Sequence, residues 1–386
     1  QSVGTVFVSA PEDIRTIFTG SPSIMEAGAG NVVLRPIVGK YSLLLLDGDE
    51  HVRMRRLLLP PLHGDRMPVY AEVIREQTEA MLDKWPPSAE LPLRPALQEL
   101  TLQVILRAVF GLSEGREQAQ LAELLRRYSD ESSSALLFFP QLQRDLGPLS
   151  PWGKIMDLRR RTTQALMDVI EARRQDIGSL EKKQDILSLL LSARDDAGQP
   201  LSDRELRDEL ITMLIAGHET TATALEWTIY LVLRHPQIHA RLLNELSTVL
   251  GREVKNAPID VEKLSQLEFT DAVIREALRL RPILPNVARK LSAPIRLRNH
   301  ELHAGTFVAP CIYLTHLRPD LYPDPESFVP DRFLGRKPDP YGWLPFGGGA
   351  RRCIGMAFAL LEMKVVLATL LRKSILLAVL VVLLAP

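Results

Sequence analysis

The chain has few cysteines, no excess of charge of either sign and almost no long apolar run. Its 386 residues include two cysteines, Cys311 and Cys353, which are too few for a disulfide framework. A reducing compartment with a free thiol is therefore favoured. Lysine plus arginine and aspartate plus glutamate both number 47, so no overall charge attracts nucleic acid or an anionic membrane. We expect a cytoplasmic monomer without a nucleic-acid partner.

The two ends of the chain are unusual. It begins with Gln1 instead of methionine, and no signal-like apolar stretch follows, so we expect that it starts inside a longer protein. Whether an N-terminal anchor precedes it stays open. The one long apolar run, residues 375–385, is shorter than the ~20 residues that a membrane-spanning helix needs. We therefore expect no membrane span in this chain, and buried strands in the tail.

Most of the sequence predicts helices. Apolar residues recur at three- and four-residue spacing, with charges between them, in residues 71–85, 97–110, 159–177 and 241–250.

A capping box of Ser202 and Glu205 opens the longest helical pattern. This pattern reaches about Arg234, where His235 and Pro236 end it because proline cannot continue a helix.

Strand patterns are few. Residues 5–9 read as one strand, and residues 295–297 with 307–308 read as a hairpin region. A helix-rich chain with strands near both ends predicts an α+β fold, mainly helical with small sheets, in one domain that spans residues 1–386.

A glycine-rich string precedes the second cysteine. Residues 346–355 read Phe-Gly-Gly-Gly-Ala-Arg-Arg-Cys-Ile-Gly, and three glycines allow a tight bend and a close approach to a flat molecule. Cys353 then stands just before an apolar helical pattern, residues 356–371. Unpaired N–H groups at that helix end, with Arg351 and Arg352, favour a thiolate. Such a thiolate could bind a haem iron, and the alternative is an inert structural cysteine.

The middle of the longest helix carries a second string, in which residues 216–221 read Ala-Gly-His-Glu-Thr-Thr. Gly217 weakens a helix and a threonine hydroxyl competes for the carbonyl one turn back, so a local kink or groove is predicted. Glu219 beside Thr220 places an acid next to a hydroxyl, which suits proton transfer. A packing glycine with a back-bonded threonine is the alternative, and His218 is expected to point elsewhere.

Two helical patterns carry charged pairs. Glu276 and Arg279, three residues apart, can form an ion pair. His51 and Arg55, four residues apart, can together bind an anion.

The string around Cys353 resembles the haem-binding signature of the cytochrome P450 family, Phe-x-x-Gly-x-Arg-x-Cys-x-Gly. All five fixed positions match, as Phe346, Gly349, Arg351, Cys353 and Gly355. The resemblance implies haem b (iron protoporphyrin IX) as the cofactor, with Cys353 as the axial ligand of its iron. It also implies a single large domain with the haem between the long central helix and the helix after Cys353.

The other strings occur in the family's order across residues 51–371. The resemblance implies that Ala216 lies against the haem and that Glu219 and Thr220 pass protons to the place where oxygen is reduced. It does not extend to the ends of the chain, where the family usually has a longer N-terminal stretch and a polar pair of C-terminal strands.

The resemblance further implies two groups of charged residues. One is structural and fixes the loop that presents the cysteine: Glu276, Arg279 and Arg332. The other binds the haem propionates: His51, Arg55, Arg289 and Arg351. Membrane-bound members often have tryptophan at the position of His51. The histidine here makes the chain similar to soluble bacterial members.

The implied activity is that of a haem-thiolate monooxygenase, which inserts one oxygen atom from O2 into a C–H bond or a double bond. No Gly-x-Gly-x-x-Gly string follows a strand, so electrons from NAD(P)H are expected through a ferredoxin or flavodoxin and its reductase. Arg53, Arg56 and Arg352 are expected to form a basic docking patch. A peroxide-driven peroxygenase and a non-catalytic haem-binding sensor are alternatives, and Glu219 with Thr220 argues against both.

The segments expected around the substrate are rich in apolar residues. They predict a lipophilic small molecule, such as a fatty acid or a terpenoid. The expected pocket residues are Met213, Ala216, Leu284 and Val287.

Overall fold

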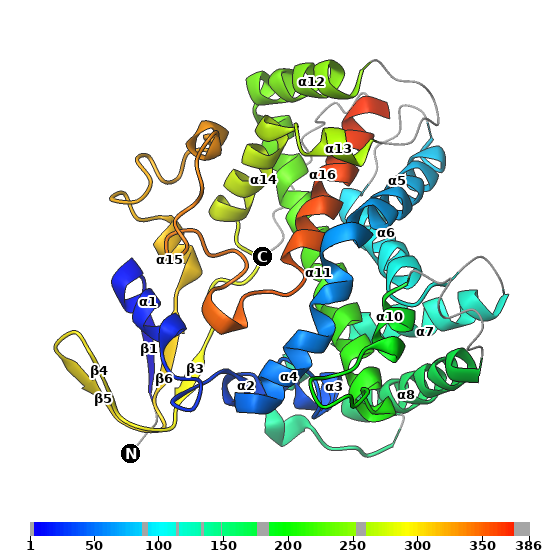
Figure 1. Cartoon of the computed structure of the whole chain (residues 1–386), viewed down its shortest axis with the longest axis vertical. Coiled ribbons are helices and arrows are strands. Elements are labelled where there is room, and N and C mark those ends of the chain that lie inside the picture. The colour runs from blue at the N-terminus through cyan, green and yellow to red at the C-terminus, as the bar shows by residue number, and fades with distance from the viewer. Residues whose placement is uncertain are drawn as a thin grey trace.

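The computed structural model describes residues 4–86, 92–112, 116–132, 135–147, 149–175, 185–251 and 260–373. Helices make up most of the structure, and short strands gather at one side of it (Figure 1). The predicted mainly helical fold with small sheets is thereby confirmed. The apolar tail, predicted to form strands, lies outside the described residues. Within the described part, no helix has both the length and the apolar character needed to cross a membrane.

The helices begin and end as follows: α1 Pro11–Thr19, α2 Ala27–Gly30, α3 Arg35–Val38, α4 Gly48–Leu58, α5 Met67–Asp83, α6 Leu93–Ala108, α7 Arg116–Ser132, α8 Pro151–Gln175, α10 Ile186–Ser192, α11 Asp203–Arg234, α12 Pro236–Leu250, α13 Val261–Leu264, α14 Glu268–Leu280, α15 Ile312–His316 and α16 Met356–Lys373. The four helices predicted from periodicity are α5, α6, α8 and α12, and each begins earlier than predicted. Proline stands in the first turn of α5, α8 and α12, where its missing N–H costs nothing and the apolar pattern has not yet begun.

The strands form two small sheets. The larger has the order β1-β6-β3-β2, with β1 (Thr5–Val8) parallel to β6 (Phe307–Pro310) and β6 antiparallel to β3 (Arg289–Leu291), which pairs with β2 (Met25–Glu26). In the smaller sheet, β4 (Ile295–Leu297) pairs with β5 (His300–Leu302).

The predicted pairing of residues 295–297 with 307–308 is therefore wrong. Strand β4 pairs with β5, which follows it after a short turn. Strand β6 pairs instead with β1, near the N-terminus.

Helix α11 runs through the middle of the helical part and packs against α6, α14, α16 and α8 (Figure 1). The predicted capping box is present, since the Glu205 N–H donates to the Ser202 hydroxyl and the Ser202 N–H donates to the Glu205 carboxylate. The helix is unbroken at Gly217. A Cβ atom there would lie 2.9 Å from Cδ1 of Ile105 in α6, so this glycine allows α6 and α11 to pack closely. The packing alternative is thus favoured over a kink.

Helix α16 carries a buried carboxyl group without a hydrogen-bond partner. Both side-chain oxygens of Glu362 are unpaired within the described structure, and the side chain is fully buried. Burial raises the pKa of Glu362 well above its usual value, because an ionised carboxylate loses its hydration there. We infer that Glu362 is protonated in the folded protein.

Replacing Glu362 with glutamine should change how stability depends on pH. The folded state keeps the Glu362 proton above the pH at which the unfolded chain releases it, so stability falls as pH rises past about 4.5. One such proton contributes a slope of about 1.4 kcal/mol per pH unit. Glu362→Gln removes this slope. The melting temperature of the variant minus that of the original chain should therefore increase from pH 5 to pH 7. The exposed Glu301→Gln serves as the control, and parallel profiles for Glu362→Gln and the original chain would contradict the inference.

Candidate functional site

The loop before Cys353 is closed by a backbone hydrogen bond. The Cys353 N–H donates to the Phe346 carbonyl at 3.0 Å, and α16 begins three residues later. Gly349 has a φ of +63°, and a Cβ atom there would lie 2.2 Å from the carbonyl oxygen of Phe18 in α1. Glycine is required at this position for both reasons. The predicted tight bend is present, and the loop lies against α1.

The Cys353 side chain can be reached by solvent, and protein atoms lie around its other sides. Burial raises the pKa of its thiol, and the Gly355 N–H, Arg55 and Arg352 offset this only in part. The expectation that the protein alone favours a thiolate is therefore wrong, because desolvation outweighs the nearby N–H group and arginines. An accessible thiol with protein walls suits a metal ligand, since a bound metal ion removes the thiol proton itself.

Four predicted anion-binding residues come together beside this loop. The pKa of His51 is lowered to about 4, mainly by burial and also by Arg351, Arg55 and Arg289, against the opposite effect of Asp47. His51 is 4% exposed and neutral at pH 7. Burial likewise lowers the pKa of Arg289 to about 10, again with Arg351 contributing. These mutual effects place the four side chains in one cluster.

Positive charge exceeds negative charge in this cluster. Arg351 pairs with Asp47, whereas no described carboxylate forms an ion pair with Arg55 or Arg289. Grouping like charges at partly buried positions is unfavourable unless an anion joins them. The surplus fits the two propionates of a haem, and Arg55 is close enough to Cys353 to affect its thiol. Within the described residues, no three His, Cys, Asp or Glu side chains gather as a metal site, so a metal here needs a group with its own donors.

One face of α11 is open although the helix is central. Ala216 is exposed, and Met213 and Thr220 are partly exposed on the same face, because residues three and four apart share a side of a helix. The Thr220 hydroxyl donates to the Ala216 carbonyl at 2.5 Å, which is the predicted back-bond. Of the remaining expected pocket residues, Leu284 is 53% exposed, whereas Val287 packs against the apolar core beside the sheet.

Glu219 and Thr220 point in different directions. The Glu219 carboxylate accepts hydrogen bonds from Arg94 at 2.8 Å and from Gln98 at 2.9 Å, both on α6. Neighbouring residues on a helix are 100° apart, so the carboxylate lies away from the face that carries Thr220. His218 is buried, with its Nδ1 3.3 Å from the Thr101 hydroxyl, and it points into the core as expected.

The structural triad forms a buried network. Arg279 donates to both Glu276 oxygens at 2.7 and 2.8 Å, and both side chains have no exposed area. Arg332 is 3.4 Å from Glu276, and its side chain is also mostly buried. The remaining Arg279 donors bind the carbonyls of His316, Pro325 and Ser327. The triad therefore holds the irregular segment that contains these three carbonyls.

Sequence reasoning missed two residues that organise the site. His316 is fully buried and bridges the Arg279 carbonyl to the Leu344 N–H, two residues before Phe346. Asp47 accepts from Arg351 and from the N–H groups of Ala27 and Gly28, at the start of α2. Asp47 stands just before α4, where an aspartate commonly caps a helix, and this position is the only signal in the sequence that marks it. Its side chain makes no capping bond to α4 and caps α2 instead.

Two of the three arginines of the expected docking patch are paired with carboxylates. Arg53 pairs with Asp195 and Glu205, and Arg56 pairs with Asp196. These acidic residues lie before α11 and in its first turn, and only Arg352 of the three lacks a described carboxylate partner.

Comparison with known proteins agrees with the fold. The model of the cytochrome P450 family matches residues 1–374. Cytochrome P450 135B1 of Mycobacterium tuberculosis is 39% identical over 373 residues, which is 95% of this chain and 75% of that protein. Cytochrome P450 138 of the same species is 38% identical over 368 residues, covering 95% and 79%. The retinoic acid-bound structure of cyanobacterial CYP120A1 superposes with a TM-score of 0.81 at 30% identity, covering 94% and 80%.

The fold, the cysteine loop and these relatives define a haem-thiolate enzyme. The chain belongs to the cytochrome P450 family and is a P450 monooxygenase, for which the family implies a haem.

Proposed function

We propose that this chain oxidises a lipophilic small molecule with O2, with Cys353 as the ligand of a haem b iron and His51, Arg55, Arg289 and Arg351 holding the propionates. The observation that carries this proposal is the surplus of positive charge beside an accessible cysteine in a P450 signature. When bound, the haem supplies the oxygen activation that no side chain provides. Residues 1–386 act as one domain, in the cytoplasm.

The protein's own residues bind, orient and move protons. Ala216 leaves room on α11, and Thr220 presents a hydroxyl on the same face. Glu219 carries protons from the Arg94 side of the helix, where its carboxylate is 33% exposed. Because Glu219 lies away from Thr220, a water or a turn of its side chain completes the path between them. Phe346, Gly349 and Gly355 shape the loop that aims the sulfur.

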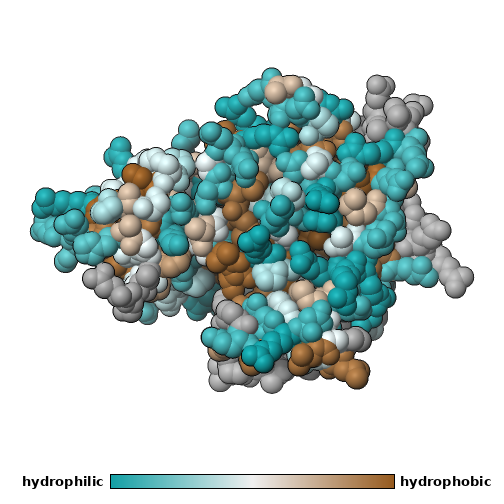
Figure 2. Space-filling view, turned by 90° about the horizontal axis from the view of Figure 1, so that it is seen from below, coloured by the Kyte–Doolittle hydropathy of each residue, from teal (hydrophilic) through white to brown (hydrophobic). Residues whose placement is uncertain are grey.

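The substrate is proposed to be a fatty acid or a terpenoid. Apolar side chains form a run between the part that holds the strands and the helical part, on the face seen in Figure 2. Met213 and Ala216 lie on the open face of α11, Leu284 adds an exposed apolar side chain, and Val287 packs against the apolar core beside the sheet. The relative bound to retinoic acid supports a lipophilic substrate. Electrons come from NAD(P)H through a ferredoxin or flavodoxin and its reductase.

Replacing Thr220 with alanine should separate electron use from product formation. The hydroxyl is lost while Cys353 and the cation cluster stay, so the optical spectrum should not change. Product per NADPH should fall by about tenfold and hydrogen peroxide should rise, because proton delivery typically contributes at least that much. Thr223→Ala, two turns from Ala216 and back-bonded in the same way to Glu219, is the control. Equal coupling in both variants would remove Thr220 from the reaction.

The class of reaction is tested with the same assay. Haem-loaded protein, generic ferredoxin and reductase, and a panel of fatty acids and terpenoids should give substrate-dependent NADPH consumption. Oxidation with hydrogen peroxide alone, at a higher rate, would instead indicate a peroxygenase.

A further inference from the structure

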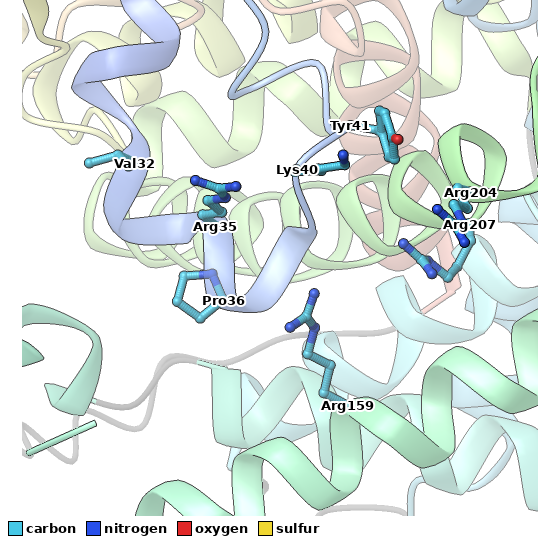
Figure 3. A pocket seen from close by; sticks show the side chains of 8 residues that line it. All are labelled: Val32, Arg35, Pro36, Lys40, Tyr41, Arg159, Arg204 and Arg207. Atoms are coloured by element: carbon cyan, nitrogen blue, oxygen red, sulfur yellow. The ribbon is translucent and has the colours of Figure 1, made fainter. Parts of the chain in front are cut away.

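A cavity lies away from the cysteine, between three elements. It has a volume of about 690 Å³, which is within the ~300–1,000 Å³ typical of small-molecule sites. Its walls come from α3 and the segment after it, from α8, and from the first turns of α11 (Figure 3). The first turns of α11 lie about 20 Å along the helix from Thr220, at 1.5 Å per residue. This cavity is therefore separate from the proposed haem site.

Most of the residues that line the cavity carry a positive charge, although much of the surface they present to it comes from apolar atoms. Five of its lining residues are Arg35, Lys40, Arg159, Arg204 and Arg207. They come from segments far apart in the sequence, and Arg159 points across the gap toward α3 and Lys40 in Figure 3. The chain as a whole has equal numbers of acids and bases, so this concentration does not reflect a generally basic protein.

Few of these charges are neutralised. Arg207 donates to the buried carboxylate of Asp208 at 2.6 and 2.9 Å. Lys40 lies over the Tyr41 ring at 4.5 Å, which stabilises a cation without removing its charge. No described carboxylate forms an ion pair with Arg35, Arg159 or Arg204. The neighbouring Arg160, in contrast, is near both Asp145 and Asp157.

We propose that this cavity binds a small polyanion of the phosphate class. Four positive charges remain after Arg207 is paired, more than one carboxylate neutralises, and arginine forks match phosphate oxygens in pairs. The three walls hold the cations apart on separate elements, so a ligand that bridges them replaces repulsion with charge-assisted hydrogen bonds. Val32 and Pro36 add apolar surface to the lining for an organic part of the ligand.

The cavity is connected to the cysteine side by one short segment. Asp208, the partner of Arg207, also accepts from the Tyr41 N–H at 3.0 Å. Two residues later, the Leu43 carbonyl accepts from Arg351 at 3.3 Å, in the cluster beside Cys353. An anion that draws Arg207 away from Asp208 would loosen this segment. We therefore expect the polyanion to change the affinity of the proposed haem site for lipophilic ligands, a consequence that rests on the proposed function.

The test measures the binding of inorganic pyrophosphate to the haem-loaded protein at low salt by calorimetry. Pyrophosphate should bind, and Arg159→Glu and Arg204→Glu should each weaken binding by about tenfold or more, because each removes a charged hydrogen bond and adds repulsion. Arg160→Glu, one residue along α8, should bind as the original chain does. Absence of pyrophosphate binding, or equal losses in Arg159→Glu and Arg160→Glu, would overturn the proposal.

Two further arms define the ligand. Tighter binding of a long-chain carboxylate than of pyrophosphate would overturn the polyanion class, and so would capture on phosphatidic acid vesicles without pyrophosphate binding, which would assign the cavity to a lipid headgroup. Spectral titration with a lipophilic ligand then tests the connection. A shifted dissociation constant with pyrophosphate, lost in Arg159→Glu, supports it; an unchanged constant with pyrophosphate bound overturns the connection but supports the site.

Discussion

Cys353→Ser should abolish the long-wavelength Soret band of the reduced, carbon monoxide-bound protein and all NADPH-driven product formation. A thiolate sulfur gives that band its position and donates electron density to the iron, and a serine oxygen does neither. The loop itself should persist, because the Cys353 N–H bond to Phe346 and the positive φ of Gly349 do not depend on the sulfur. Haem bound by the arginine cluster should therefore remain detectable at a reduced level.

The control for this experiment is the other cysteine. Cys311 is partly buried at the start of α15, where its N–H donates to the Val8 carbonyl of β1, and it stands outside the P450 signature. Cys311→Ser should keep the band and the activity. A Cys353→Ser protein that keeps the long-wavelength band, or a Cys311→Ser protein that loses it, would rule out Cys353 as the ligand of the haem iron.

The sequence predicted the parts of the site that depend on local chemistry. The spacing of Cys353, Gly349 and Phe346 is fixed by one bend, and a capping box of Ser202 and Glu205 needs four consecutive residues. Such features are visible in a sequence because every participant is a near neighbour. The same holds for Glu276 and Arg279, one turn apart.

What the sequence could not predict depends on distant contacts. Arg94 and Gln98 turn Glu219 toward α6 from more than a hundred positions away, and Asp47 meets Arg351 over a still longer separation. The sign of the Cys353 pKa shift was missed for a related reason. Positive neighbours can be counted in a sequence, whereas the desolvation that outweighs them exists only once the walls are in place.

Arg279→Ala should cause the largest loss of stability of any single change outside the cysteine loop. It leaves the fully buried Glu276 with Arg332 at 3.4 Å and the Val329 N–H at 2.9 Å, and it frees three carbonyls that Arg279 had bound. Removing one member of a buried ion pair costs about 3–5 kcal/mol, because the other charge remains without compensation. The midpoint of urea unfolding should therefore fall sharply, as followed by circular dichroism.

The chain supplies a matched control on another helix. Glu123 and Arg126 have the same spacing as Glu276 and Arg279 and a similar distance of 2.9 Å, but both are exposed. Arg126→Ala should cost less than about 1 kcal/mol, since water replaces the partner. The segment that Arg279 holds includes His316, which binds the Leu344 N–H close to the cysteine loop, so haem content should fall in Arg279→Ala and stay normal in Arg126→Ala. Equal small losses in the two variants would mean that burial adds nothing to the Glu276–Arg279 pair, and the cysteine loop would then need another support.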